Sequence, residues 1–159
     1  MTRVRHARES DLPVLRGVQS ATLAESWPDL LELGVRADPT LLVAEPGLPL
    51  SEGGRPPREG GIADPVGYAL AVTDGPEDVG YLAELAITPE SQNQGHGSEL
   101  LETLVALYRQ KGVDRLRVTV RAVDDRARSF YRTQGFERRE RLPDHYEEGN
   151  GFLLVRELS

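Results

Sequence analysis

The fold of this chain is decided by the stretch Gln92-Asn93-Gln94-Gly95-His96-Gly97. It follows an apolar, strand-like run from Val79 to Ile87 and precedes an amphipathic pattern from Ser98 to Gln110, which predicts a helix. A glycine-bearing turn between a strand and a helix gathers backbone N–H groups at the positive end of the helix, where a phosphate binds well. Glycine permits both the unusual backbone angles and the close approach of a ligand. The sequence therefore predicts a phosphate-binding loop at residues 92–98.

The other patterns predict strands and helices that alternate around this loop. Strands are expected at about 3–8, 40–44, 66–73, 79–87, 115–120, 136–146 and 152–158, and helices from about 11, at 28–33, at 98–110 and at 124–133. Asp11 and Asp124 are the expected N-caps of their helices. The resulting order, β-α-α-β-β-β-α-β-α-β-β, favours a mixed α/β sheet of about seven strands with helices on both faces.

Composition limits the class of protein. A chain of 159 residues is expected to form a single domain, and its formal net charge of −7 argues against nucleic-acid binding. Cysteine is absent, which excludes disulfides, thiolate catalysis and cysteine-ligated metals. The sequence shows no apolar segment long enough to span a membrane and no apolar signal region near its start, so a cytoplasmic protein is expected.

Residues 46–65 interrupt the regular patterns. Five prolines and five glycines fall within these twenty residues, too many for a stable helix or strand. We expect a flexible loop within the domain, serving either as a tolerated insertion or as a functional lid.

A second motif follows the glycine turn about thirty residues later: Asp124-x-x-Ala127-x-x-x-Tyr131-x-x-x-Gly135-Phe136. Together with Gln92-x-x-Gly95-x-Gly97, it resembles the two conserved segments of the GNAT superfamily of N-acetyltransferases. The resemblance covers most of the second half of the chain, whereas residues 1–78 agree in the order of their elements alone.

The resemblance implies that acetyl-coenzyme A binds as a co-substrate in a cleft where two parallel strands splay apart. Backbone groups of Leu85, Ala86 and Ile87 would contact the pantetheine arm. The backbone N–H groups of Gln92, Asn93, Gln94, Gly95, His96, Gly97 and Ser98 would hold the pyrophosphate. Asp124, Ala127 and Tyr131 would complete the coenzyme site. No metal is implied, and a homodimer is common in the superfamily.

Two residues are candidates for the chemistry of acetyl transfer. Tyr131 would protonate the departing coenzyme A thiolate, although an aromatic residue beside Phe130 also suits simple packing. Glu84 would be the general base, acting through water, because a carboxylate among apolar neighbours can take up a proton near neutral pH. The alternative for Glu84 is a salt bridge to an arginine such as Arg117 on the next strand.

The acceptor is an amine in either of two classes. The ending from Asp144 to Phe152 resembles that of the RimI-type protein N-terminal acetyltransferases, which implies that Tyr146 contacts a peptide N-terminus beside an acidic rim of Asp144, Glu147 and Glu148. The alternative for this segment is a charged hairpin tip. Thr119 stands where that subfamily usually carries a glutamate, and Asp124 where the motif usually carries an asparagine. These departures keep a small amine open as acceptor, such as a polyamine, an amino acid derivative or an aminoglycoside.

Three further interpretations remain at this stage. Trp27 either borders the acceptor or packs in the core. The imidazole of His96 is expected to face solvent or to touch a phosphate lightly. The whole fold could also serve as a non-catalytic module that binds acetyl-coenzyme A. A dinucleotide-binding Rossmann domain fits poorly, because the glycine spacing differs from Gly-x-Gly-x-x-Gly.

Overall fold

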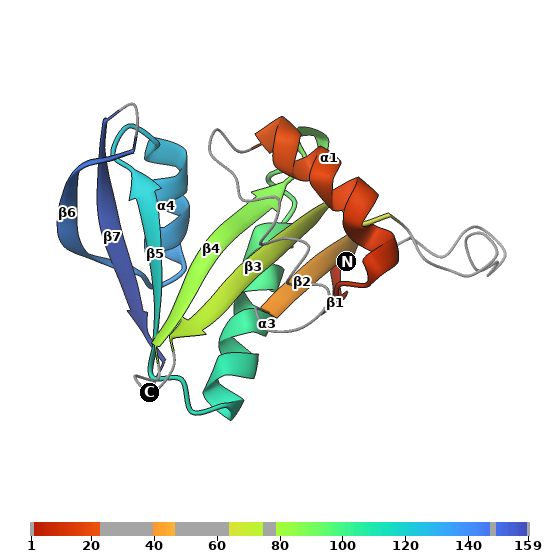
Figure 1. Ribbon diagram of the computed structural model, residues 1–159, viewed down its shortest axis with the longest axis horizontal. Coiled ribbons are helices and arrows are strands. Elements are labelled where there is room, and N and C mark those ends of the chain that lie inside the picture. Colours follow the sequence, from red (N-terminus) through yellow and green to blue (C-terminus); the bar gives the residue numbers. More distant parts are fainter. Residues whose placement is uncertain (1, 23–39, 47–63, 75–78, 147–148, 159) are drawn as a thin grey trace, which may run out of the picture. The chain divides into compact units, whose positions relative to one another are not determined.

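The computed structural model describes residues 2–22, 40–46, 64–74, 79–146 and 149–158 (Figure 1). Their elements, in chain order, are β1 (Thr2–His6), η1 (Glu9–Asp11), α1 (Leu12–Thr22), β2 (Thr40–Pro46), β3 (Gly67–Asp74), β4 (Val79–Ile87), η3 (Pro89–Ser91), α3 (His96–Gln110), β5 (Arg115–Arg121), α4 (Asp125–Thr133), β6 (Glu137–Tyr146) and β7 (Gly149–Glu157). The strands form one seven-stranded sheet in the order β1-β2-β3-β4-β5-β7-β6.

This architecture confirms the predicted mixed sheet of seven strands. The parallel pair is β4 and β5, joined in register from Val79↔Arg115 to Leu82↔Val118, while the pairs β1–β2, β5–β7 and β6–β7 are antiparallel. The expected helix at 28–33 and almost all of the loop at 46–65 lie outside the described residues. A single domain and the splayed cleft stay predictions.

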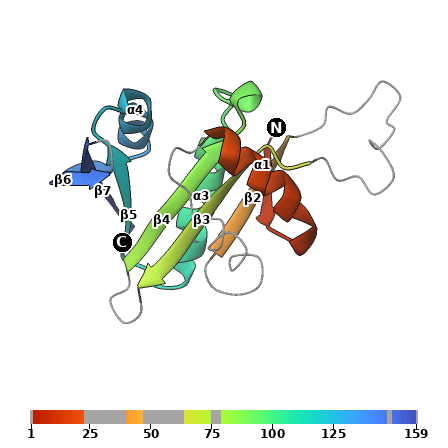
Figure 2. The ribbon, with the colours of Figure 1, turned by 45° about the horizontal axis from the view of Figure 1, so that its top comes forward.

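The chain forms two compact units, of which the first comprises Met1–Leu70 and Glu84–Leu104. Strand β2 of this unit is deeply buried, with five consecutive buried residues from Leu41 to Glu45. Continuous burial is typical of a strand that is covered on both faces. Figures 1 and 2 agree with this pattern, because α1 and the beginning of α3 lie on opposite faces of the sheet in this unit.

The second unit comprises Ala71–Ala83 and Val105–Ser159. Strand β5 alternates as predicted: Leu116, Val118 and Val120 are buried, and the residues between them are half-buried. Gly80 on β4 permits close packing of α3, because a Cβ atom there would lie 2.5 Å from the ring of Tyr108. Strand β6 forms the edge of the sheet and holds Pro143, which an edge strand tolerates since it needs fewer N–H donors.

The boundaries of several elements differ from the sequence-based expectation. Strand β7 begins at Gly149 instead of Phe152, because Gly149 pairs with Tyr146 and extends the hairpin. Asp11 is not the simple N-cap that the sequence predicts. It ends the one-turn helix η1, and its Oδ2 accepts the backbone N–H of Arg8 at 2.7 Å.

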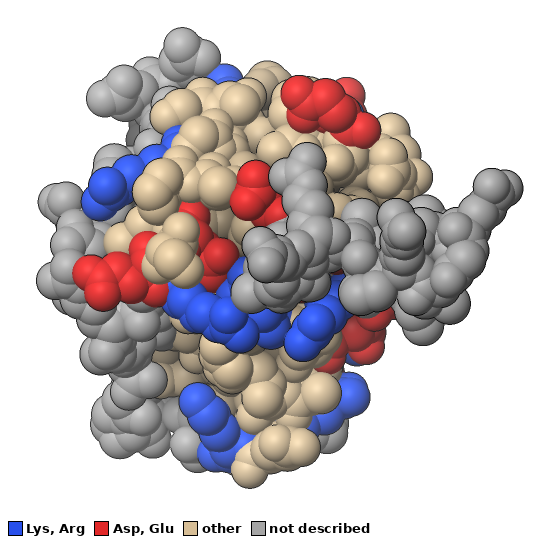
Figure 3. Space-filling view, turned by 90° about the vertical axis from the view of Figure 1, so that its right-hand side faces the viewer, with Lys and Arg blue, Asp and Glu red and all other residues tan. Residues whose placement is uncertain are grey.

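No helix within the described residues is long and apolar enough to cross a membrane. The acidic excess of the chain is not spread evenly over the surface. Figure 3 shows a face on which Lys and Arg side chains form a band, with Asp and Glu side chains on either side of it. The net charge of −7 therefore coexists with local positive potential.

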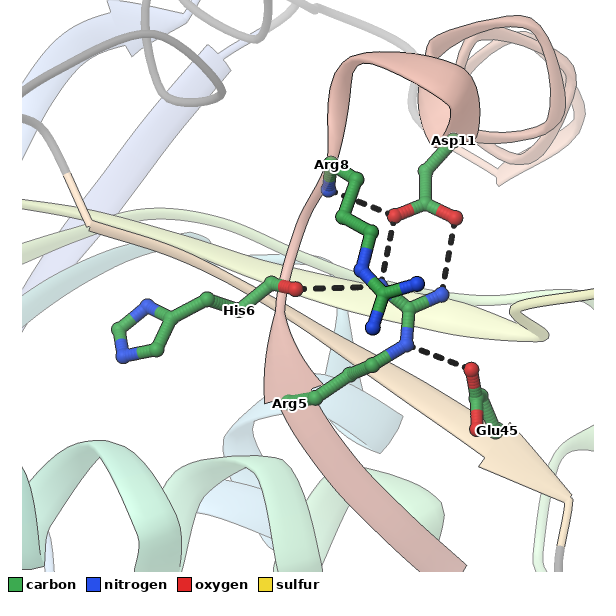
Figure 4. A network of polar contacts seen from close by, with 5 residues as sticks. All are labelled: Arg5, His6, Arg8, Asp11 and Glu45. Carbon is green, nitrogen blue, oxygen red and sulfur yellow. Dashed lines mark hydrogen bonds and ion pairs between the residues drawn. The ribbon is translucent and has the colours of Figure 1, made fainter. Parts of the chain in front are cut away.

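A buried ion network ties β1, η1 and β2 together in the first unit (Figure 4). The guanidinium of Arg5 donates from Nη1 and Nη2 to the two carboxylate oxygens of Asp11, at 2.8 and 2.9 Å. Its Nε donates to Oε1 of Glu45 at 2.6 Å, and Nη1 also donates to the backbone oxygen of His6. Both carboxylates are buried. Burial opposes ionisation of Asp11, but the hydrogen bonds from Arg5 and from the Arg8 N–H outweigh it and lower the pKa of Asp11 below its usual value of 3.8.

The substitution Asp11→Asn is expected to lower the free energy of unfolding by about 2–3 kcal/mol at pH 7, because Arg5 keeps Glu45 but loses its two charge-assisted hydrogen bonds to Asp11. The pKa of Asp11 is lowered by folding, so its stabilisation is present above about pH 4 and declines as the pH falls through the folded-state value. Chemical denaturation at several pH values should therefore show that the difference in free energy of unfolding between wild type and variant becomes smaller below pH 4.

Asp125→Asn is the matched control, since the Asp125 side chain is 91% exposed and faces Arg128 at 3.4 Å. An exposed pair of this kind contributes about 0–1 kcal/mol. Equal losses for the two variants at pH 7 would contradict the structural role of the Arg5 network.

Candidate functional site

The predicted phosphate loop forms a compact turn between β4 and α3. After β4, the short helix η3 is closed by the Ser91 N–H, which donates to Thr88 O at 2.9 Å. The Gln92 side chain then turns back and its Nε2 donates to Ile87 O at 3.0 Å. Asn93 and Gly95 have positive φ angles of 63° and 87°, the region that glycine and asparagine tolerate best. The side chain of the first motif residue thus fixes the turn to the end of the strand.

Helix α3 begins at His96, two residues earlier than predicted. The Glu99 N–H donates to Gly95 O at 3.1 Å, which places Gly97 inside the first helical turn. The first amides of a helix have no acceptor within the helix and carry its positive dipole end. Residues 93–95 are exposed, and a Cβ atom at Gly95 would meet no atom within 4 Å. The loop thus offers amide donors and open space, which suit a pyrophosphate.

The expected orientation of His96 is wrong. Its imidazole is buried, with 5% exposure, because the earlier helix start directs residue 96 toward the interior. Burial also lowers the pKa of His96 below its usual value of 6.5, so the ring is neutral at pH 7. The expected exposure of the ring to solvent is therefore wrong, while its contact with a phosphate stays a prediction.

Glu84 is buried on β4, with 6% exposure, between the buried residues Leu82 and Ala86. Its Oε1 accepts two hydrogen bonds, from Gln19 Nε2 at 2.8 Å and from Tyr68 OH at 2.9 Å. These donors come from α1 and β3, so the carboxylate joins three elements of the first unit. Both of these donors are neutral, and the alternative of a salt bridge between Glu84 and an arginine such as Arg117 stays a prediction, because the two residues belong to different units.

Tyr68 is fully buried beside this carboxylate. Burial, followed by the negative charge of Glu84 and its hydrogen bond, raises the pKa of Tyr68 far above its usual value of 10. The phenol therefore stays protonated and remains a donor to Glu84. Both described donors are neutral, so they orient the carboxylate without adding a compensating charge.

A second polar group lies in the second unit, on neighbouring strands. Tyr81 on β4 and Thr119 on β5 join their hydroxyl groups at 2.9 Å, and both side chains are half-buried. Thr119 stands at the position where RimI-type enzymes usually carry a glutamate. Its hydroxyl is hydrogen-bonded to Tyr81, a residue that the sequence analysis did not identify.

Helix α4 holds the second motif. Asp124 is exposed, and its Oδ1 accepts the Ala127 N–H at 3.0 Å, which confirms the predicted N-cap. The rings of Phe130 and Phe136 each pack against the buried ring of Tyr131 edge-to-face, with centroids 5.1 and 5.3 Å away. This packing fixes the direction of the Tyr131 phenol, and its role toward coenzyme A stays a prediction.

The structure does not describe every predicted site residue. Trp27, Glu147 and Glu148 lie outside the described residues, as do the side chains of Asp144 and Tyr146. Of the predicted coenzyme contacts, Ala86 is buried while Leu85 and Ile87 are half-buried. Within the described ranges, no group of three His, Asp or Glu side chains is placed to hold a metal ion.

Sequence reasoning missed Gln19 and Tyr68 as partners of Glu84. One signal was present in the sequence: Gln19 follows Leu12, Leu15 and Val18 on the buried face of α1, where a polar side chain requires a buried partner. Nothing in the sequence indicated which partner, because Gln19 and Glu84 are 65 residues apart.

Comparisons with known proteins agree with this geometry. A profile of the "Acetyltransferase (GNAT) family" matches residues 22–136. An uncharacterized N-acetyltransferase of Methanocaldococcus jannaschii is 33% identical over 91 residues, and the match spans 57% of each protein.

Two crystal structures share the fold at low identity. The ribosomal-protein-S18-alanine N-acetyltransferase of Escherichia coli is 19% identical with a TM-score of 0.76, covering 100% of this chain and 95% of its own. NAA60 of Arabidopsis thaliana, in complex with acetyl-CoA, is 16% identical with a TM-score of 0.81, and the match covers 99% of both chains.

Tyr68→Phe tests the network around Glu84. Removing one donor to a buried carboxylate is expected to lower the free energy of unfolding by about 1–3 kcal/mol. Tyr81→Phe is the matched control, because it deletes a phenol hydroxyl whose partner is a half-buried neutral hydroxyl, and its loss should be smaller. Chemical denaturation at pH 7 measures both values. A Tyr68→Phe protein as stable as wild type would show that Glu84 does not need this hydrogen bond.

Proposed function

The chain belongs to the GNAT acetyltransferase family, and on that premise we propose that it transfers an acetyl group from acetyl-coenzyme A directly to a primary amine. The observation that carries the proposal is the turn at residues 92–98. In this turn the Gln92 side chain bonds to Ile87 O, Gly95 has a positive φ angle, and helix α3 begins at His96. We infer from these features that the turn binds a pyrophosphate.

In the proposed reaction, the amine nitrogen attacks the thioester carbonyl, and a C–N bond forms as the C–S bond breaks. The nitrogen gives up a proton to a base, and the sulfur leaves as a thiolate that receives a proton, so the products are an acetamide and free coenzyme A. Glu84 is proposed to accept the amine proton through water, and Tyr131 to protonate the thiolate. With no cysteine in the chain, no thioester intermediate on the enzyme is proposed.

A peptide N-terminus is the acceptor that we propose first. The E. coli protein of the same fold is named for the alanine of a ribosomal protein, and the segment from Asp144 to Phe152 resembles the RimI-type ending. A small amine is the alternative acceptor, because Thr119 replaces the RimI-type glutamate and hydrogen-bonds to Tyr81.

Thiol release in the presence of acetyl-coenzyme A tests the proposed activity. Peptides of varied first residue, polyamines, amino acids and aminoglycosides are compared as acceptors, and at least one amine should release free thiol. Tyr131→Phe is expected to lower kcat by about tenfold or more, in the usual range of a general acid, while the Kd for acetyl-coenzyme A by calorimetry changes little.

Two results would contradict this proposal in different ways. Coenzyme binding without thiol release for any amine would indicate a non-catalytic binding module. Unchanged kcat in Tyr131→Phe would remove the acid role from that residue and leave the activity intact.

Glu84→Gln tests the proposed base. The amide oxygen of glutamine can still accept hydrogen bonds from Gln19 and Tyr68, so the variant should fold, yet it cannot take up a proton. The pH–rate profile of kcat/KM should lose its rising acidic limb, with the rate reduced by about a hundredfold. If the variant keeps the wild-type profile, another group is the base.

A further inference from the structure

The second unit holds a partly buried cation, the guanidinium of Arg117. Arg117 lies on the half-buried face of β5, and its Nε atom is buried without a hydrogen-bond partner. Among the described residues, no carboxylate forms an ion pair with its guanidinium. Arginine fixes five N–H donors in a planar fork, and donors of this kind are rarely left without acceptors when partly buried.

The neighbours of Arg117 offer hydroxyl groups instead of carboxylates. Tyr81 is its register partner on β4, and Thr119 follows two residues later on the same face of β5. These two residues are the hydrogen-bonded hydroxyl pair. On the other side, Arg117 pairs with Val155 of β7, and Glu137 of β6 is the partner of Val155 one strand further out. Neighbouring strands lie about 4.8 Å apart, so strand β6, which holds Glu137, is two strands away from Arg117 on β5.

Glu137 also has a cationic neighbour of its own. Its carboxylate lies 3.7 Å from Nη2 of Arg139, and its side chain is largely exposed. Arg115, on the same face of β5, is likewise near a carboxylate, with Nε 3.7 Å from Glu157. Arg117 thus differs from the exposed arginines around it: it is partly buried, its strand neighbours Tyr81 and Thr119 carry hydroxyls, and no carboxylate among the described residues forms an ion pair with it.

We propose that Arg117, with the hydroxyls of Tyr81 and Thr119, recognises a carboxylate of the acceptor amine. The planar guanidinium matches the two oxygens of a carboxylate, and adjacent hydroxyls can donate to it as well. The carboxylate belongs either to a free amino acid or to an acidic side chain near a peptide N-terminus. This inference rests on the proposed acetyltransferase function and specifies its acceptor.

Matched acceptor pairs test the inference and separate the two sources. One arm compares free amino acids with their amides. The other compares peptides that begin with Glu-Glu with peptides that begin with Gln-Gln, all with amidated C-termini. Wild type should favour the carboxylate-bearing member of one arm by about tenfold or more in kcat/KM, since a charge-assisted hydrogen bond is lost in the other member.

Arg117→Met should reduce that preference to near one while the Kd for acetyl-coenzyme A stays unchanged. Arg115→Met is the matched control on the same strand, and it should keep the wild-type preference. Equal use of both members by wild type, retention of the preference by Arg117→Met, or weaker coenzyme binding in that variant would each overturn the inference.

Calorimetry with acetylated products provides a readout that needs no turnover. One pair is N-acetylglycine with N-acetylglycinamide, and the other is N-acetylated Glu-Glu with N-acetylated Gln-Gln peptides that carry amidated C-termini. In one of the two pairs, wild type should bind the carboxylate-bearing member about tenfold more tightly, and Arg117→Met should bind both members equally. Failure of every amine to release thiol, with this binding preference intact, would overturn the proposed function alone. Thiol release without any carboxylate preference would overturn the inference about Arg117 alone.

Discussion

The Glu84 carboxylate imposes the strongest constraint on the first unit, because a buried charged group must be given hydrogen-bond donors. Gln19 and Tyr68 supply them to one oxygen, from α1 and β3. The position of α1 in turn depends on the chain just before it, where Asp11 binds Arg5 and the Arg8 N–H. Two polar networks therefore act in series: the first fixes the start of α1, and α1 then carries Gln19 to the carboxylate on β4.

The turn after β4 is held by a different kind of contact. The Gln92 amide bonds to a backbone oxygen at the end of the strand, and positive φ angles at Asn93 and Gly95 let the chain enter α3 at once. Because β4 holds both Glu84 and Ile87, one strand relates the carboxylate to the amides of the turn within the first unit. A rigid β4 strand would therefore hold both the proposed base and the proposed phosphate-binding amides in fixed positions.

Short sequence patterns correctly predicted those features of the structure that depend on neighbouring residues, such as strand bounds and helix caps. The alternating apolar pattern gave the bounds of β4 correctly at 79–87, and the Asp124 cap of α4 was correct because capping depends on three residues of sequence. His96 was misplaced because its direction depends on the first residue of α3, and helix ends are poorly defined by apolar periodicity. Tyr68 and Gln19 escaped prediction since their partner is set by tertiary packing across 16 and 65 residues.

The polar groups around Glu84 and Arg117 have a chemical consequence for the two roles proposed for them. The two donors described for Glu84 are neutral, and the strand neighbours of Arg117 carry the hydroxyls of Tyr81 and Thr119. A base that receives a proton should not be held by a fixed cation, because the cation would favour its ionised form and weaken its basicity. A guanidinium that binds a carboxylate should likewise have no competing acid. Neutral surroundings for each group, within its own unit, are therefore what the proposed acceptor, with both an amine and an acid group, would require of the protein.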